Sequence, residues 1–318
     1  MGNLLKIGTR GSRLAMIQAE GVAARLRAAH PDLEVQIEIF RTSGDRDRAT
    51  PLARMPGVGF FVKELETGLL DGRIDLAVHS MKDVPTELPE GLEVEAVVPE
   101  REDPRECLVT PEGLRLDQLP QGATVGSSSP RRRAMMLAVR PDLAFIDLRG
   151  NVETRLKKLE AGVCGATVLA RAGLARLGLF DHRMVEIETD VMLPAAGQGA
   201  LGLEFRAADE RVRQLLAPLD HPPSRWAAVA ERALVRWLGA GCRTPLGVLG
   251  TIDSHGQLIL EARILSPDGR EAIREKAGGY APQAALLGNT LAWSLQGRNA
   301  GRLISPDWGG HDDGARDA

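Results

Sequence analysis

The chain has 318 residues, 43% of them hydrophobic and 26% charged, a composition typical of a globular protein of two or three domains. The formal net charge of −3 and the lack of an apolar run of about 20 residues argue against nucleic-acid binding and membrane insertion. The three cysteines are far apart and odd in number, which argues against a disulfide framework or a metal site. Because the start, MGNLLKIGTRGS, has no apolar signal core, we expect a cytoplasmic protein. No pair of histidines has metal-ligand spacing, so we expect no bound metal.

In the first third of the chain, short apolar runs alternate with amphipathic helical patterns. Strands are predicted at 4–8, 33–40 and 74–79, and helices at 12–30 and 61–72. This order predicts a largely parallel sheet with helices on both faces. The ligand crevice of such a sheet lies outside the carboxyl ends of its strands.

The sequence EREDPRE at 100–106 interrupts this pattern, and a second α/β set follows it. Strands are predicted at 123–127, 143–150 and 166–170, and helices at 130–140 and 152–162. The glycine-rich run LPAAGQGALGLEF at 193–205 has the character of a hinge where the chain crosses between domains. Two α/β units joined by crossing strands indicate a two-lobed protein with a central cleft.

From about residue 222 the pattern becomes that of a small α+β domain. A periodic helix is predicted at 224–238, and a final helix at 283–299. Between them, alternating strands surround two hairpin turns, SHGQ and PDGR. We therefore expect three domains, with the limits 1–99 plus 200–218, 100–199, and 219–318.

Three turns share one design, in which a strand ends, a polar turn follows and a helix begins. They are IGTRGSRLA with Arg10 and Ser12, VGSSSPRRR with Ser127, Ser128, Ser129, Arg131 and Arg132, and LRGNVETR with Arg149 and Arg155. Ser12 and Asn151 are predicted N-caps, and Pro130 suits a first helical turn. Helix N-termini bind anions, and arginine binds carboxylates through paired hydrogen bonds. Together the three turns indicate a cleft that holds several anionic groups.

The motif HSMKDVP follows a buried strand and places Lys82 beside Asp83. The two residues form either an anion-binding cation next to a cation-binding acid or an ordinary surface lysine and turn aspartate; spacing alone does not separate these readings. His79 is expected to pack at the strand end.

The cysteines differ in their surroundings. Cys107 and Cys164 lie in apolar runs and are expected to be buried. Cys242, in GAGCRTPLG, has glycine neighbours and a nearby Arg243 that favours the thiolate, so it is a candidate functional thiol.

The order of motifs resembles the porphobilinogen deaminase (hydroxymethylbilane synthase) family. The motifs are TRGSRLA, GFFVKELE, DLAVHSMKDVP, EREDPR, VGSSSPRRR, LRGNVETRL, AGLARLG, LPAAGQGALGLE and GCRTPLG, and the resemblance is looser beyond the mid-240s. It implies two α/β domains like the halves of a type II periplasmic binding protein around a cleft, and a small third α+β domain. It also implies an enzyme that joins four porphobilinogen molecules into hydroxymethylbilane and releases four ammonia. The reaction is primed on a covalent dipyrromethane cofactor, held through a thioether to Cys242.

The resemblance also assigns roles to individual residues. It makes Asp83 catalytic. Cofactor binding falls to Cys242, Lys82, Asp83, Ser127, Ser128, Ser129, Arg131, Arg132 and Arg155, and substrate binding to Arg10, Ser12, Phe61, Ser80, Arg149 and Arg176. In the segment 42–58 the chain departs from the family: MPGVG puts Val58 where many relatives have a loop lysine.

Two further expectations concern partners and the competing class. Nothing in the sequence demands more than a monomer, so we expect one, and we expect its product to pass to uroporphyrinogen-III synthase. The alternative is a non-enzymatic two-lobed binding protein for small carboxylated ligands. That alternative explains the lobes, the hinge and the arginines, but not Asp83 beside Lys82, the third domain or Cys242.

Overall fold

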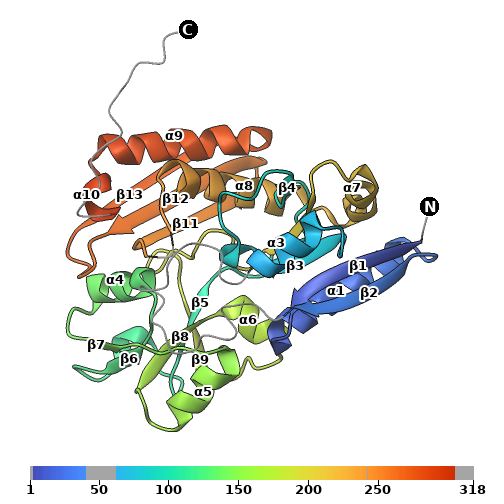
Figure 1. Cartoon of the computed structure of the whole chain (residues 1–318). Coiled ribbons are helices and arrows are strands. Elements are labelled where there is room, and N and C mark those ends of the chain that lie inside the picture. Colours follow the sequence, from blue (N-terminus) through green and yellow to red (C-terminus); the bar gives the residue numbers. More distant parts are fainter. Residues whose placement is uncertain (1–2, 41–61, 242, 305–318) are drawn as a thin grey trace.

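The computed structural model describes residues 3–40, 62–241 and 243–304, which form three sheets with helices packed against them (Figure 1). The first sheet has the strand order β2-β1-β3-β10-β4. Its strands are β1 (Leu4–Arg10), β2 (Glu34–Phe40), β3 (Leu76–Ser80), β4 (Leu92–Glu93) and β10 (Leu201–Arg206). Its helices are α1 (Arg13–Ala29), α3 (Lys63–Leu70) and α7 (Glu210–Leu216). α1 and α7 cover one face, and α3 packs on the other.

The second sheet repeats this arrangement with the order β7-β6-β8-β5-β9. Its strands are β5 (Glu106–Val109), β6 (Thr124–Gly126), β7 (Ala144–Ile146), β8 (Ala166–Ala170) and β9 (Met184–Ile187). Its helices are α4 (Pro130–Val139), α5 (Val152–Glu160) and α6 (Arg171–Arg176). In each sheet the fourth strand in the order is antiparallel to its neighbours and the other pairings run parallel. The predicted fold of two type II α/β lobes is confirmed, with one antiparallel strand in each otherwise parallel sheet.

The two antiparallel strands are reached by the segments that join the lobes. Residues 99–105, the first crossing segment, lead from the first lobe into β5, and residues 188–200, the second crossing segment, lead back into β10. The segments touch, since Glu102 N donates to Gly199 O at 3.2 Å. Gly199 has a φ of +87°, and a Cβ there would lie 2.3 Å from Glu102 O, so only glycine fits this approach.

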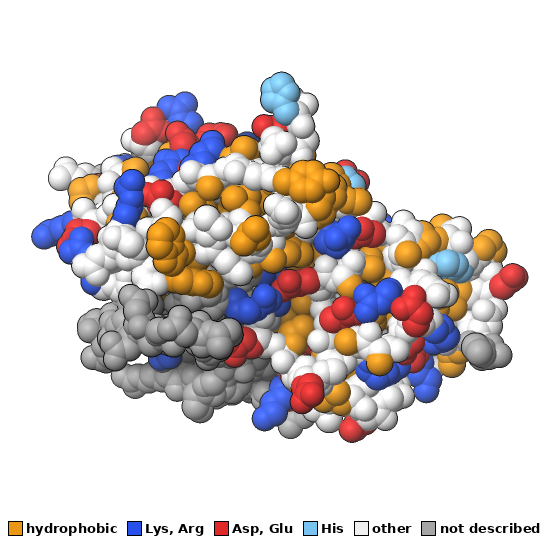
Figure 2. Space-filling model, turned by 90° about the horizontal axis from the view of Figure 1, so that it is seen from above, with side chains coloured by type: hydrophobic (Ala, Val, Ile, Leu, Met, Phe, Trp, Pro, Cys, Tyr) orange, Lys and Arg blue, Asp and Glu red, His pale blue; other side chains and the backbone are white. Residues whose placement is uncertain are grey.

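The third sheet is an antiparallel meander, β11-β12-β13, as the two predicted hairpins require. Its strands are β11 (Leu246–Ile252), β12 (Gln257–Leu265) and β13 (Ala272–Tyr280), and its helices are α8 (Pro222–Trp237), α9 (Ala284–Gly297) and α10 (Gly301–Ile304). α8 and α9 pack on one face through a common apolar core. Leu286 and Trp293 of α9 are exposed. Figure 2 views the molecule from the side on which α9 lies in Figure 1, and hydrophobic side chains are scattered there among charged ones. From the strand pairings in the three sheets we propose three domains: residues 1–99 with 200–218, residues 100–199, and residues 219–318.

Local sequence determines where the site helices begin. Ser12 caps α1 by accepting from Ala15 N at 3.3 Å, and Asn151 caps α5 by accepting from Thr154 N at 2.8 Å. Pro130 lies in the first turn of α4. These predictions are confirmed, and each cap places a helix N-terminus behind a polar turn.

Two predictions about buried side chains are also confirmed. Cys107 and Cys164 are free and buried, and burial raises the pKa of Cys107 to about 12, which leaves it an inert thiol. His79 packs at the end of β3 against Glu204, with 2.8 Å between Nε2 and the carboxylate. Among the described helices, none is long and apolar enough to cross a membrane.

Candidate functional site

Lys82 and Asp83 lie in a short 3₁₀ turn, η2 (Met81–Asp83), directly after β3. Asp83 is exposed, whereas Lys82 is half-buried and donates from Nζ to Gln198 Oε1 at 3.1 Å. Burial lowers the pKa of Lys82 to about 8, and the positive charges of Arg132 and Arg131 act in the same direction. The first lobe's lysine therefore lies within electrostatic reach of the second lobe's arginines.

Arg131 and Arg132 are buried at the start of α4 and converge on one carboxylate, that of Glu106 at the start of β5. Arg132 donates to it from Nε at 3.1 Å and from Nη2 at 2.8 Å, and Arg131 donates from Nη2. The Nη1 atoms of both side chains donate to backbone oxygens, Arg131 to Leu193 O and Arg132 to Val168 O, both at 2.7 Å. Burial by itself raises the pKa of Glu106, but the charges of Arg132, Arg131 and Lys82 hold it well below its usual range.

Arg155 and Arg149 extend this group of charges. Arg155 is half-buried in the first turn of α5 and donates from Nε to Gly150 O at 2.8 Å. Burial lowers the pKa of Arg155 to about 10; the charges of Arg132 and Arg149 lower it further, and Asp83 and Glu106 oppose them. Asp83 of the first lobe thus acts on Arg155 of the second.

These residues form what we call the cationic cluster. It consists of Lys82, Arg131, Arg132, Arg149 and Arg155, with the acids Asp83 and Glu106. Five basic groups face two acidic ones, so the cluster has an excess of positive charge where the lobes meet. Such an excess is suited to a ligand that carries several carboxylates.

The three predicted serines line the turn before α4. Ser127 is buried and accepts from Ser129 N at 3.3 Å. Ser128 donates to Leu148 O at 3.4 Å. Ser129 caps α4 by accepting from Arg132 N at 3.4 Å. This turn holds the helix N-terminus and both buried arginines at the cluster.

The first-lobe residues predicted to bind substrate lie at neighbouring strand ends. Arg10 ends β1, and Ser80 ends β3 and accepts from Gln18 Nε2 at 3.0 Å. Arg176 is placed differently: it donates from Nη2 to Gly199 O at 2.7 Å, on the second crossing segment. Burial lowers its pKa, and Glu102 and Arg25, not the cationic cluster, are the charges that act on it.

Some predicted residues fall outside the described part of the chain. Phe61, Val58 and Cys242 belong to this group, so their roles remain predictions. The described residues on either side of Cys242 are Gly241, whose N–H donates to Thr244 Oγ1 at 3.2 Å, and Arg243.

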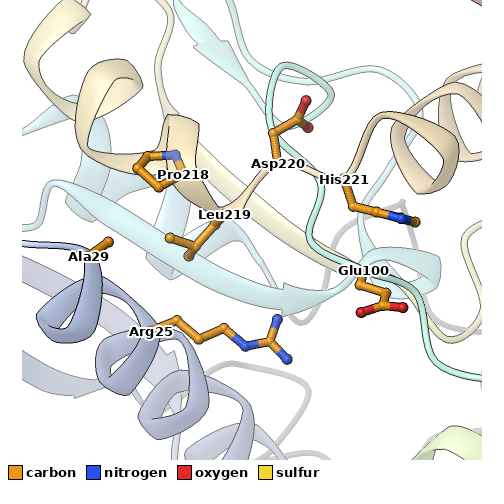
Figure 3. Close-up of a pocket in the computed structure, with 7 residues that line it drawn as sticks. All are labelled: Arg25, Ala29, Glu100, Pro218, Leu219, Asp220 and His221. Carbon is orange, nitrogen blue, oxygen red and sulfur yellow. The ribbon is translucent and has the colours of Figure 1, made fainter.

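A separate hollow of about 280 Å³ lies between α1 and residues 218–221 (Figure 3). Arg25 extends from α1 toward the segment that carries Glu100, and Asp220 and His221 lie on the opposite rim. One arginine with two acids does not offer the charge excess that a polycarboxylate needs. The hollow is therefore not the predicted site.

Comparison with known proteins decides the family. The family model "Porphobilinogen deaminase, dipyromethane cofactor binding domain" matches residues 5–214, and "Porphobilinogen deaminase, C-terminal domain" matches residues 226–297. The chain belongs to the porphobilinogen deaminase family. It is 48% identical over 299 residues to the porphobilinogen deaminase of Desulforudis audaxviator, covering 94% of this chain and 96% of that protein. The enzyme of Moorella thermoacetica is 47% identical over 300 residues, 94% of this chain and 95% of the relative.

Solved structures of other proteins are more distantly similar. The aliphatic sulphonate binding protein SsuA of Escherichia coli is 17% identical, with a TM-score of 0.39, over 74% of this chain and 70% of that one. The periplasmic VFT2 domain of BvgS from Bordetella pertussis is 14% identical, with a TM-score of 0.40, over 67% and 85%. At scores this low, neither similarity bears on function. Because the porphobilinogen deaminase matches span the third domain as well, the two-lobed binding-protein alternative is not favoured.

The residues present fit the dipyrromethane cofactor of the porphobilinogen deaminase family. That group carries acetate and propionate carboxylates, and the described donors beside Asp83 are basic and hydroxyl groups. Arg131 and Arg132 already share Glu106, so their charges act from buried, fixed positions.

Sequence reasoning missed several buried polar residues around this candidate site. Glu106 and Gln198 are fully buried and contact predicted site residues. Glu231 on α8 binds Arg101 of the first crossing segment through both carboxylate oxygens, at 2.6 and 3.2 Å. Arg232, also on α8, donates to Val84 O at 3.0 Å and Pro85 O at 2.7 Å, just after Asp83. The available signal for Gln198, Glu231 and Arg232 was their position within apolar runs; Glu106 and Arg101 lie in the polar stretch EREDPRE, which gave no such signal.

Proposed function

We propose that the chain condenses four porphobilinogen molecules head to tail into the linear tetrapyrrole hydroxymethylbilane, with release of four ammonia. The single observation that carries this proposal is the cationic cluster beside an exposed aspartate, in a chain whose family is porphobilinogen deaminase. Each porphobilinogen carries an acetate and a propionate, so the growing chain adds carboxylates that the cluster can bind.

Arginine and lysine binding by itself does not accelerate the reaction, since groups that bind substrate and transition state equally leave the barrier unchanged. We assign the chemical role to Asp83. Its carboxylate assists proton transfer to the leaving amino group, and it then pairs with the positive charge left on the pyrrole as the amine departs as ammonia. When bound, the primed chain would offer its free α-carbon to the methylene carbon that the ammonia leaves, and loss of the proton from that α-carbon would restore the aromaticity of its ring.

The cofactor-binding residues follow from the same arrangement. Ser127, Ser128, Ser129, Lys82, Arg131, Arg132 and Arg155 would hold the carboxylates of the dipyrromethane, with Cys242 as its covalent attachment point. When bound, the dipyrromethane supplies the free α-position to which the first porphobilinogen is added. Arg10, Ser12, Phe61, Ser80, Arg149 and Arg176 are proposed for the incoming substrate.

Two finer proposals concern the setting of the reaction. We propose that the enzyme acts as a cytoplasmic monomer and that its product passes to uroporphyrinogen-III synthase. Sedimentation equilibrium at several protein concentrations tests the monomer: a mass that rises with concentration contradicts it. Adding uroporphyrinogen-III synthase to the reaction tests the transfer of the product, since uroporphyrinogen III must then replace hydroxymethylbilane.

The test of the proposed function is the intact mass of the purified protein together with product analysis. Active wild-type protein is expected to exceed the mass of the bare chain by one dipyrromethane and to release four ammonia per hydroxymethylbilane. Cys242→Ser is expected to lack the added mass, whereas the control Cys164→Ala, at a buried cysteine that is not predicted to hold the cofactor, keeps it. Active wild-type enzyme with the mass of the bare chain would refute the tether, and mass-verified enzyme that releases no ammonia would refute the function.

A further inference from the structure

Gln198 is a fully buried amide on the second crossing segment, with polar partners from two parts of the chain. Its Oε1 accepts from Lys82 Nζ at 3.1 Å, and its Nε2 donates to Pro104 O at 2.7 Å. One side chain thus connects the turn that holds Asp83 to the first crossing segment.

The chemistry of its partners fixes the orientation of this amide. A carbonyl oxygen such as Pro104 O accepts only, so the NH₂ group of Gln198 must face it. The amide oxygen then faces Lys82, whose ammonium donates only. The opposite orientation would place two donors together and two acceptors together, and buried polar groups without partners are costly.

The backbone around Gln198 is held as firmly as its side chain. Arg101 Nε donates to Gln198 O at 2.7 Å, and Gly197 N donates to Glu231 Oε2 at 2.6 Å. Glu231 is fully buried on α8 and also accepts from Gly250 N at 2.8 Å. The amide oxygen therefore occupies a position set by both crossing segments and by the third domain.

Lys82 needs such an acceptor because of the charges around it. These are Asp83 in the same turn, Glu106 from β5, and Arg131 and Arg132 from α4. The exposed Asp83 is close enough to stabilise the ammonium, but the two arginines and burial oppose it. A neutral oxygen at hydrogen-bond distance holds the ammonium in place without neutralising it.

We infer that Gln198 is a positioning residue for the condensation reaction: it holds the Lys82 ammonium beside Asp83, at the junction of the crossing segments, where the carboxylates of bound pyrroles are received. This inference rests on the proposed function. It assigns a task to the GQGA motif beyond that of a flexible hinge.

The first test measures Lys82 directly, without substrate. The chain has only six lysines, so ¹³C-lysine-labelled holoenzyme gives few side-chain signals, and Lys82→Arg identifies the one from Lys82. Relative to wild type, the isosteric Gln198→Glu is expected to raise the pKa of Lys82 by roughly one unit or more, and Gln198→Met to lower it. The matched control Gln214→Glu, at an exposed glutamine on α7, leaves the titration unchanged.

The second test is the pH dependence of kcat/KM for the same holoenzymes. Gln198→Met is expected to reduce kcat/KM roughly 10- to 100-fold at neutral pH, the loss of one hydrogen bond to a charged group, and to move the alkaline limb to lower pH. Gln198→Glu moves that limb upward. A purely structural role for Gln198 would lower activity without moving the limb.

These measurements distinguish a failure of the positioning role of Gln198 from a failure of the proposed condensation reaction. If the Lys82 titration is the same in folded Gln198→Glu as in wild type, the inference fails and the proposed function stands. A shifted titration with unchanged kcat/KM also overturns the positioning role. If mass-verified wild-type enzyme makes no hydroxymethylbilane, the proposed function fails, whatever Lys82 does. Should Gln198→Met not fold, Gln198→Glu decides the question alone.

Discussion

Arg132 donates a hydrogen bond to each carboxylate oxygen of Glu106, from Nε at 3.1 Å and from Nη2 at 2.8 Å, in the interior of the second lobe. Glu106 is fully buried, and Arg131 donates to the same carboxylate. The guanidinium groups of Arg131 and Arg132, which are predicted to bind carboxylates in the cleft, are therefore both held by the carboxylate of Glu106. The anchor fixes their positions while leaving the cluster with a net positive charge.

The first prediction removes that anchor. Glu106→Gln keeps the shape of the side chain but leaves two buried guanidinium groups without a counter-charge. Breaking one partner of a buried ion pair costs about 3–5 kcal/mol, and urea unfolding should show a loss of this size. The control is Glu153→Gln, which removes the partly exposed partner of Arg13 at 2.8 Å and should change stability by about 0–1 kcal/mol. Equal effects in the two variants would contradict the anchor.

The local features of this site could be predicted from sequence, but its buried partners could not. The caps formed by Ser12 and Asn151 join residues only three positions apart, so they can be predicted from the local sequence. Glu106 meets Arg131 and Arg132 across 25 and 26 positions, and only because β5 inserts antiparallel beside β8. Spacing along the chain carries no sign of such a pairing.

The two lobes were predictable for a related reason. Alternating strand and helix patterns at 4–40 and 123–170 encode βαβ units, and parallel pairing follows from them. The antiparallel insertion of β5 and β10 does not follow from these patterns, because each strand comes after a segment that crosses between the lobes and not after a helix of its own lobe. The contact between Glu102 and Gly199, on which the crossing depends, becomes visible only in three dimensions.

The second prediction concerns that crossing. Gly199→Ala would place a methyl group 2.3 Å from Glu102 O at a φ of +87°, so either the backbone or the crossing segments must shift. Strain at such a residue costs about 1–3 kcal/mol, and we expect at least this loss in urea unfolding, with reduced turnover. Gly21→Ala is the control, because no atom beyond its chain neighbours and the backbone of α1 lies within 4 Å of its Cβ position. It should stabilise the protein by about 0.5–1 kcal/mol; a similar gain for Gly199→Ala would show that the crossing tolerates a side chain.

The third prediction is a pH dependence of stability from Glu66 on α3. Burial and the charge of Glu204 raise its pKa to about 7, against the opposing effects of His79 and Lys63. The folded state thus binds a proton that the unfolded chain, with a pKa of 4.5, has released. The resulting contribution to stability is present below pH 4.5 and is lost as the pH rises to about 7.

Glu66→Gln removes this dependence, since its amide stays neutral at all pH values. The melting temperature of the variant relative to wild type should rise by roughly 2–4 °C between pH 5 and pH 8, as expected for about 1 kcal/mol. Glu20→Gln, on the exposed face of α1, serves as the control with a constant difference. Parallel melting curves for Glu66→Gln and wild type across this range would contradict the raised pKa.

The fourth prediction separates the chemistry of Asp83 from binding. Asp83→Asn keeps the size of the side chain and the turn that follows, where Arg232 holds Val84 O and Pro85 O. It removes the carboxylate that we assign to proton transfer and to ion pairing with the pyrrole cation, so turnover should fall roughly 10²- to 10⁴-fold. The intact mass should still include the dipyrromethane, and KM should change far less than kcat, because the arginines and Lys82 remain.

Asp71→Asn, at the exposed end of α3, is the matched control and should retain normal turnover. Near-normal turnover of Asp83→Asn with a full complement of cofactor would exclude Asp83 as the catalytic acid, and a bare-chain mass would show instead that its main task is to hold the cofactor.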